Sequence, residues 1–203
     1  MAEGQRVYII CNPSTDIGKS VAYTLLDENY QIILAGPDYS ALKALQKQLD
    51  QDGFNHVSVA LLEPSKEIDW KNLIEILERL DNQLAGIIHV HEYESTDPEL
   101  FEMDYEMFSA KMDAHLWGTY VGAKHIVPLL HTESSGSLLH LVETMKEDDF
   151  SMYNAMIKRA LDAMLTMMAK ELKESNLNIK YIEVDDASLK EVLLLNLDNT
   201  ANE

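Results

Sequence analysis

The segment Val7-Tyr-Ile-Ile-Cys-Asn-Pro-Ser-Thr-Asp-Ile-Gly18 decides the fold of this chain, because an apolar run of strand length passes directly into a polar turn. Residues with helical spacing of apolar positions follow the turn to about position 28, and a second apolar run starts at Gln31. A buried strand that leads through a turn into a helix and then into another strand is a βαβ unit.

Short apolar stretches rich in Val, Ile and Leu recur along the rest of the chain, and most of them lack strict alternation with polar residues. Strands that are apolar on both faces and alternate with helices indicate a parallel sheet covered on two sides. The predicted strands are Arg6–Cys11, Gln31–Ala35, His56–Leu61, Leu84–Val90, Ser137–Val142 and Asn178–Val184. The predicted helices are 16–28, 39–52, 67–80, 103–131 and 151–175.

The 203 residues, of which 46% are hydrophobic and 25% charged, suit one globular domain over residues 1–203. A short amphipathic stretch at Ser188–Leu197 and a polar tail make up most of the terminal segment 185–203. The formal net charge of −19 repels nucleic acid and anionic membranes, so we expect neither as a partner. No basic and apolar leader opens the sequence, which predicts a cytoplasmic protein. The single cysteine, Cys11, is expected to be a buried thiol.

Several segments, taken in order, resemble the short-chain dehydrogenases/reductases, the SDR family. The resemblance implies a three-layer, Rossmann-like, doubly wound parallel sheet of about six strands in the order 3-2-1-4-5-6. It also identifies the chain as a degenerate and C-terminally shortened member, because the usual Pro-Gly and substrate-covering segment do not follow the sixth strand. The matching segments are Val7–Gly18, Gln31–Gly36, Asp113–Thr119, Gly136–Val142, Lys158–Met164, Ala169–Leu172 and Asn178–Val184.

In the family, a turn with three glycines brings the backbone close to the cofactor pyrophosphate at a helix N-terminus. The resemblance puts Asn12, Asp16 and Gly18 at the three glycine positions, beside Ser14 and Ile17. Asn12 can still adopt the left-handed conformation. Asp16 is expected either to repel a diphosphate, at a cost of roughly 4 kcal/mol, or to cap the helix that starts after it.

Two further positions that correspond to cofactor contacts in the family are altered. Asp38, after the second strand, can accept hydrogen bonds from ribose hydroxyls, which favours NAD over NADP, or can cap the next helix through Ala41. His89-Val-His-Glu92 replaces the family's Asn-Asn-Ala-Gly after the fourth strand. We therefore expect no cofactor, and NAD(P) if there is one.

The resemblance also implies a catalytic tyrosine followed by a lysine four residues later, with a serine and an asparagine completing the site. Lys158 keeps the lysine position, but Asn154 stands at the tyrosine position and Glu143 at the serine position. His115 stands at the asparagine position. Together, Glu143, His115 and Lys158 are candidates for a different acid/base site, and ordinary structural roles are the alternative.

Tyr153 is one position too early to serve as the family tyrosine. On a regular helix, five residues rotate it about 140° away from Lys158. A one-residue bulge in that helix would restore the pair, as such bulges do at other functional sites.

Four residues near the ends of two neighbouring predicted strands, His89, His91, Glu92 and His140, are candidate metal ligands. Their spacing fits no known zinc motif, and ordinary packing is the alternative that we favour. We predict no metal.

Two predicted helices, 103–131 and 151–175, carry a second apolar stripe in addition to the one that faces the sheet. In the first helix this stripe contains Ala110, Ala114, Trp117 and Val121. In the second it contains Met156, Ala160, Ala163 and Met167. A second subunit is the expected cover, with loops or the C-terminal segment as the alternative.

Taken together, the sequence predicts an SDR-fold protein that is a non-catalytic interaction or regulatory subunit. It is expected to form a homo-oligomer or to pair with an active relative. One alternative is an NAD(P)-dependent oxidoreductase for a small alcohol or carbonyl compound with an altered active site. The other is a nucleotide sensor that does not react.

Overall fold

The computed structural model of the chain describes residues 6–79, 83–91, 101–130, 136–144, 151–185 and 187–198. Its centre is a six-stranded sheet in the order β3-β2-β1-β4-β5-β6, in which every neighbouring pair is parallel. The predicted fold class and strand order are therefore confirmed. The strands are β1 (Arg6–Cys11), β2 (Gln31–Gly36), β3 (Val57–Leu61), β4 (Gln83–His91), β5 (Gly136–Glu143) and β6 (Leu177–Val184).

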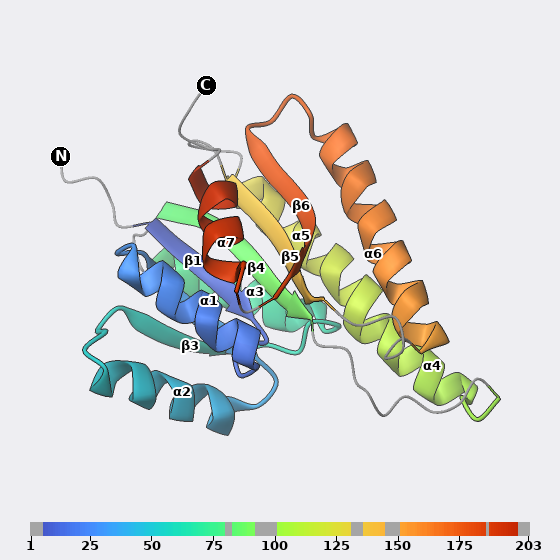
Figure 1. Cartoon of the computed structure of the whole chain (residues 1–203), viewed down its shortest axis with the longest axis horizontal. Helices are drawn as coiled ribbons and strands as arrows, with labels where there is room; N and C mark the ends of the chain where they lie inside the picture. The colour runs from blue at the N-terminus through green and yellow to red at the C-terminus, as the bar shows by residue number, and fades with distance from the viewer. Residues whose placement is uncertain are drawn as a thin grey trace.

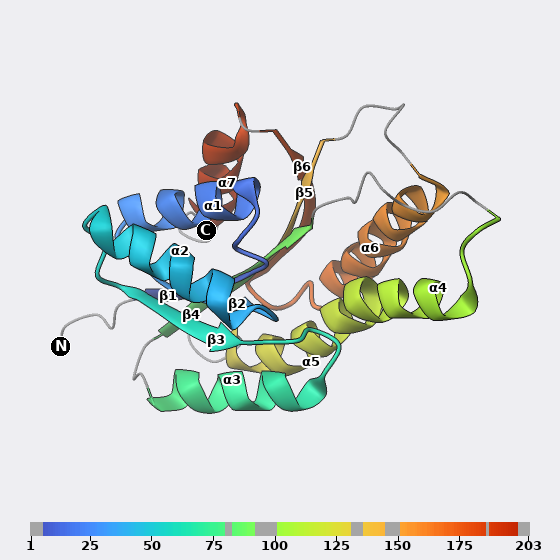
Figure 2. The same ribbon diagram turned by 90° about the horizontal axis from the view of Figure 1, so that it is seen from below.

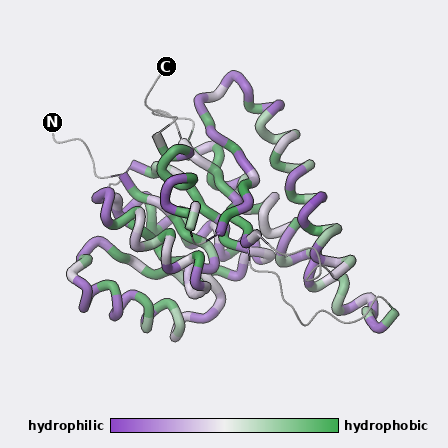
Figure 3. The backbone as a smooth tube through the Cα atoms, viewed as in Figure 1, coloured by the Kyte–Doolittle hydropathy of each residue, from purple (hydrophilic) through white to green (hydrophobic). Residues whose placement is uncertain are grey.

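Helices cover both faces of the sheet (Figures 1 and 2). On one face lie α1 (Asp16–Asp27), α2 (Tyr39–Gln51) and α7 (Leu189–Asp198), and on the other α3 (Glu67–Arg79), α5 (Gly118–Leu130) and α6 (Met152–Glu171). The central strands are mostly hydrophobic, whereas the outer turns of the helices are polar (Figure 3). Both faces of the central strands β1, β2, β4 and β5 are therefore buried, which explains why their sequences do not alternate.

The amphipathic stretch predicted at Ser188–Leu197 forms α7. Its residues Leu189, Leu193 and Leu197 are buried in the same core cluster as α1. The C-terminal helix thus completes the α1 face of the sheet and does not cover the second stripes of the helices on the other face.

The predicted helix 103–131 is not one regular helix. It consists of α4 (Tyr105–Met112), a π-helical turn η1 (Asp113–Trp117) and α5. Its expected second stripe also divides into parts with different surroundings. Val121 is completely buried, Ala110 and Ala114 line a cavity, and Trp117 keeps 46% of its surface exposed. The π turn changes the helical phase, so positions on one predicted stripe face different ways.

Candidate active site

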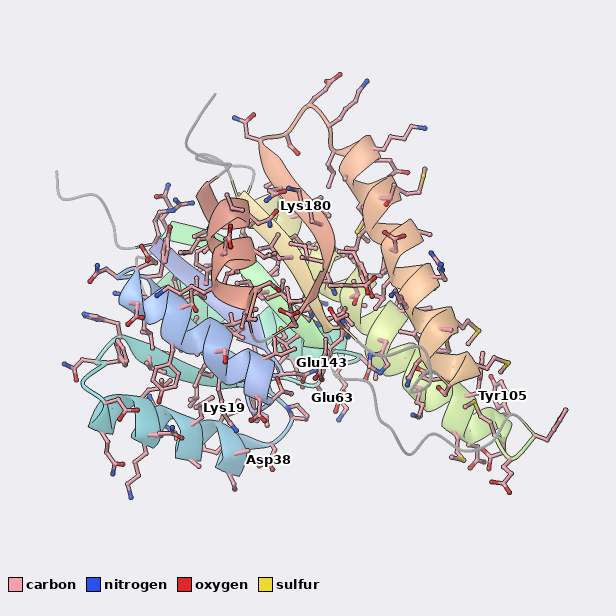
Figure 4. All side chains as sticks on the ribbon, viewed as in Figure 1. Lys19, Asp38, Glu63, Tyr105, Glu143 and Lys180 are labelled. Atoms are coloured by element: carbon pink, nitrogen blue, oxygen red, sulfur yellow. The ribbon has the colours of Figure 1, made fainter. Side chains whose placement is uncertain are left out.

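A cavity of about 530 Å³ opens where β1 and β2 end. This is the edge of the sheet at which Asp38, Glu63 and Glu143 also lie (Figure 4). Sheets of this type bind ligands at the carboxyl ends of the strands near the point where the strand order reverses, here between β1 and β4. The described residues that line the cavity are Asn12, Ser14, Thr15, Gly36, Pro37, Asp38, Ala41, Leu42, Ala110, Lys111, Ala114, His115, Tyr153 and Asn154.

The turn after β1 keeps a left-handed backbone although its first glycine is replaced. Asn12 has φ 59°, as predicted, and its Nδ2 donates a hydrogen bond of 3.2 Å to the carbonyl of Val90. At the third glycine position a side chain is excluded, because a Cβ on Gly18 would lie 2.7 Å from the Asn12 carbonyl oxygen. The turn therefore preserves the close backbone packing with one glycine and one asparagine.

The prediction that Asp16 caps the first helix is wrong. Thr15 is the N-cap, and its hydroxyl accepts a 2.9 Å hydrogen bond from the Gly18 amide. Asp16 is the first helical residue; its side chain is 94% exposed and pairs with Lys19 at 3.1 Å. It is not among the described residues that line the cavity. Because the Asp16 carboxylate is exposed to water and paired with Lys19, its repulsion of a bound diphosphate should be weaker than the roughly 4 kcal/mol expected from the sequence.

The other predicted cofactor contacts divide between the cavity and the core. Asp38 lines the cavity and also caps α2, accepting from the amides of Ser40 and Ala41 at 2.9 and 3.0 Å, as the sequence suggested. Ile17 is buried in the core on the α1 face, and His89 is buried within the sheet. Among the predicted set, Asn12, Ser14 and Asp38 are the residues on the cavity wall.

Tyr153 and Lys158 are not realigned. Within α6 the helix runs without interruption, so the bulge considered above is absent from this described segment. Lys158 instead pairs with Glu183 on β6, with its Nζ 2.6 Å from the carboxylate. Tyr153 nevertheless lines the cavity beside Asn154, and both side chains are almost completely buried. Glu143, at the exposed end of β5, is not part of the described cavity wall.

Lys111 was missed by the sequence analysis. Its Nζ lies 4.8 Å from the centre of the Tyr153 ring, and the residue lines the cavity. It precedes His115 by four residues, and this spacing was a signal that both side chains share one helical face. The π turn that contains His115 brings its ring centre 6.4 Å from that of Tyr153. The Tyr153 ring, the Lys111 ammonium group and the His115 imidazole therefore lie close together on the cavity wall.

The histidines considered as metal ligands do come together, but as a row of ring contacts. Rings of His89 and His140 stack with their centres 4.4 Å apart, and His91 contacts both His140 and His115 through ring nitrogens. Within the segments that the structure describes, no group of three or more acidic, histidine or cysteine side chains is arranged to hold a metal ion. Glu92 lies outside the described residues.

The parallel strand order and the cavity at the carboxyl ends of β1 and β2 define a Rossmann-like α/β protein. A family model described as enoyl-(acyl carrier protein) reductase matches residues 14–184. The chain belongs to this family, within the short-chain dehydrogenases/reductases. The resemblance inferred from the sequence motifs is thus confirmed.

Relatives with curated names are distant. An uncharacterized oxidoreductase of Staphylococcus saprophyticus is 21% identical over 182 residues, which span 87% of this chain and 76% of the relative. One from Staphylococcus aureus strain MRSA252 is 22% identical over the same shares of the two chains.

Solved structures with the same fold cover most of the chain. A short-chain dehydrogenase of Salmonella enterica serovar Typhi has a TM-score of 0.79 at 16% identity, over 97% of this chain and 90% of its own. A short-chain oxidoreductase of Pseudomonas aeruginosa PAO1, described as containing an atypical catalytic center, has a TM-score of 0.78 at 13% identity in its NADPH-bound form. The match covers 94% of this chain and 76% of that one.

In the described segments, no helix combines the length and the apolar character that crossing a membrane requires.

Proposed function

We propose that this protein is an NAD(P)-dependent short-chain oxidoreductase that acts on a small alcohol or carbonyl compound through an altered acid/base site. The observation that carries the proposal is the shared cavity, which joins the turn after β1 to Tyr153, Lys111 and His115. Its volume of about 530 Å³ falls within the range of small-molecule sites.

The residues on the wall fit a nicotinamide cofactor. The turn of Asn12, Ser14 and Thr15 leads into the N-terminus of α1, where amide groups favour an anion such as a diphosphate. Asp38 stands where a carboxylate can accept from ribose hydroxyls and would repel a 2′-phosphate, which favours NAD over NADP. When bound, the cofactor would accept a hydride from an alcohol or donate one to a carbonyl compound, which the side chains of this chain cannot do.

The side chains of this chain would take up the hydroxyl proton of an alcohol or supply a proton to a carbonyl oxygen. The phenol of Tyr153 would hold and release a proton at its Oη, the role that the family gives to its tyrosine. The ammonium group of Lys111 supplies the positive charge beside this ring, because Lys158 is engaged with Glu183. The imidazole of His115 adds a second hydrogen-bonding group to the same wall.

Nucleotide binding is the first test. We expect NAD or NADH at a hundred times its dissociation constant to add about 2.7 kcal/mol to the free energy of unfolding, measured by thermal shift. NADP and NADPH, added to parallel samples, should give the smaller response. No shift with any of the four nucleotides at millimolar concentration would contradict the proposal.

A matched set of variants then separates the altered site from the family's usual pair. With NAD and a panel of short-chain alcohols, Tyr153→Phe should lower turnover by roughly 10² to 10⁴-fold. Lys111→Met should also lower it, whereas Lys158→Met should retain it. Equal loss in both lysine variants would indicate that Lys158 rearranges to join the site.

A non-catalytic interaction subunit is the second candidate. Two observations favour it: Asn154 occupies the position of the family tyrosine, and Lys158 forms an ion pair on β6. Nucleotide binding without turnover of any alcohol in the panel would favour instead the sensor that binds but does not react.

A further inference from the structure

Four histidines form a continuous row from the cavity into the centre of the sheet. His115 lines the cavity, and its Nδ1 lies 3.2 Å from Nδ1 of His91 on β4. The other nitrogen of His91, Nε2, lies 2.8 Å from Nδ1 of His140 on β5. His140 in turn stacks on His89, its partner in the β4–β5 register. The site described above uses only the first of these four.

The inner members of the row are neutral at ordinary pH. Burial lowers the pKa of both His91 and His140 well below the usual value, and neighbouring imidazoles lower it further. Burial also lowers the pKa of His89 to about 4. A neutral imidazole carries one N–H group and one acceptor nitrogen. His91, which contacts a nitrogen on each side, must therefore donate to one neighbour and accept from the other.

The far end of the row decides the direction. His140 is fully buried, and its Nε2 has no hydrogen-bond partner among the described residues. If His140 accepted from His91 at Nδ1, its proton would sit on Nε2 as a buried, unsatisfied N–H group. Buried backbone N–H groups without an acceptor are rarer than carbonyl groups without a donor, and we apply the same preference to the imidazole nitrogens. The favoured arrangement has the proton of His140 on Nδ1, donated to His91.

We propose that His140 and His91 are positioning residues that fix His115 as the tautomer with its proton on Nε2. The hydrogen bonds run one way, from His140 Nδ1 to His91 Nε2 and from His91 Nδ1 to His115 Nδ1. His115 then presents an N–H donor at its other nitrogen. Because His115 lines the cavity, this tautomer would, as far as the proposed function holds, set the hydrogen-bonding role that His115 can play toward a bound ligand.

Histidine tautomers can be measured directly in the full-length protein without any nucleotide or substrate. Long-range ¹H–¹⁵N spectra of protein labelled with ¹⁵N-histidine distinguish protonated from unprotonated ring nitrogens. We expect one set of signals in which His140 and His91 carry the proton on Nδ1 and His115 carries it on Nε2. A proton on Nε2 of His140, or on Nδ1 of His115, would overturn the proposal.

Variants of His140 test whether this residue fixes the tautomers of His91 and His115. His140→Leu removes the donor, so we expect the single tautomer of His91 and of His115 to be lost and replaced by mixed signals. His140→Asn keeps an amide donor near the Nδ1 position and should restore the single tautomer. His56→Asn, at an exposed position outside the row, should leave the signals of the other histidines unchanged.

The two proposals fail separately. Unchanged His115 signals in His140→Leu would refute the positioning role, whatever the protein binds. If the tautomers are as expected but no nicotinamide nucleotide binds, the oxidoreductase proposal fails and the hydrogen-bond chain stands. The wild-type spectrum by itself shows the direction of the hydrogen bonds among the histidines, even if the leucine variant does not fold.

Discussion

At the scale of single residues, the substitutions in the turn after β1 have different consequences from those that their chemistry suggests in isolation. A carboxylate at the second glycine position points into solvent, and an asparagine at the first adopts the left-handed conformation that glycine would supply. Gly18 remains because backbone atoms of Asn12 and Pro13 occupy the space of a side chain. The close contact with the neighbouring backbone thus explains why glycine is required at position 18.

Gly18→Ala should therefore destabilise the fold. The added Cβ would meet backbone atoms at 2.7 Å, and such overpacking costs about 1 to 3 kcal/mol. Thermal denaturation should show a lower midpoint by roughly 2 to 12 °C. The control is Gly36→Ala, whose Cβ would be at an ordinary 3.7 Å from Leu42, and a comparable loss in the control would contradict the argument.

The buried histidines predict a pH dependence of stability. The pKa of His89 falls from about 6.5 in the unfolded chain to about 4 in the fold, because burial disfavours its cation. The contribution of neutral His89 to the free energy of unfolding is complete above pH 6.5 and is lost as the pH falls toward 4. Between pH 7 and pH 5, the wild-type protein should lose about 2 kcal/mol more than His89→Phe in chemical denaturation. The rings of His91, His140 and Trp70 lie around His89, and none of these three residues is changed in the variant. An equal change in the free energy of unfolding between pH 7 and pH 5 in the two proteins would refute the prediction.

At the scale of secondary-structure elements, the two helices around the site differ from the expected pattern in opposite ways. The bulge considered for α6 is absent there, whereas a π-helical turn interrupts the neighbouring helix at Asp113–Trp117. This turn carries His115 to the cavity and leaves Trp117 half exposed. A π turn adds one residue to a helical turn, so the sequence periodicity on its two sides cannot be read as one stripe.

The N-terminus of α1 offers a direct test of the corrected cap. Thr15→Ala should cost about 1 kcal/mol, because it removes the acceptor for the Gly18 amide. Asp16→Ala, next in sequence, should cost less than about 0.5 kcal/mol, because an exposed ion pair contributes little. Urea denaturation of both variants measures the difference. The reverse order of effects would show that Asp16, not Thr15, supports the helix start.

At the scale of the whole molecule, the helices on the far side of the sheet leave apolar surface exposed. Trp117 and Tyr120 on this side are 46% and 47% exposed, and Met167 of α6 is 50% exposed. The C-terminal helix α7 packs on the opposite face with α1 and cannot cover them. We propose that a second copy of this chain covers this surface, as isologous dimers do.

The oligomeric state tests this proposal. Light scattering at tens of micromolar should give the mass of a dimer, and Trp117→Glu together with Tyr120→Glu should shift it to a monomer. Leu195→Glu, at an apolar position of α7 that is 59% exposed on the opposite face of the sheet, is the matched control and should remain dimeric. A monomeric wild-type protein would contradict the proposed dimer. An active relative would then be the remaining candidate partner.

The sequence alone determined the sheet. Each strand is a local apolar run, and β1 at Arg6–Cys11 agrees with its predicted bounds because the signal lies within six consecutive residues. The alternation of strands with helices, together with the family motifs, was enough for the strand order. The position of Asn12 in a left-handed turn and the cap of α2 at Asp38 were also local properties, fixed by one or a few neighbouring residues.

Only the tertiary structure decided the site. Lys111, His115 and Tyr153 come from different parts of the chain, and their meeting depends on a π turn and on how α6 packs beside it. Lys158 takes Glu183 as a partner, 25 residues away, which no helical spacing indicates. Side-chain direction at such positions follows from packing between elements, whereas the elements themselves follow from local sequence.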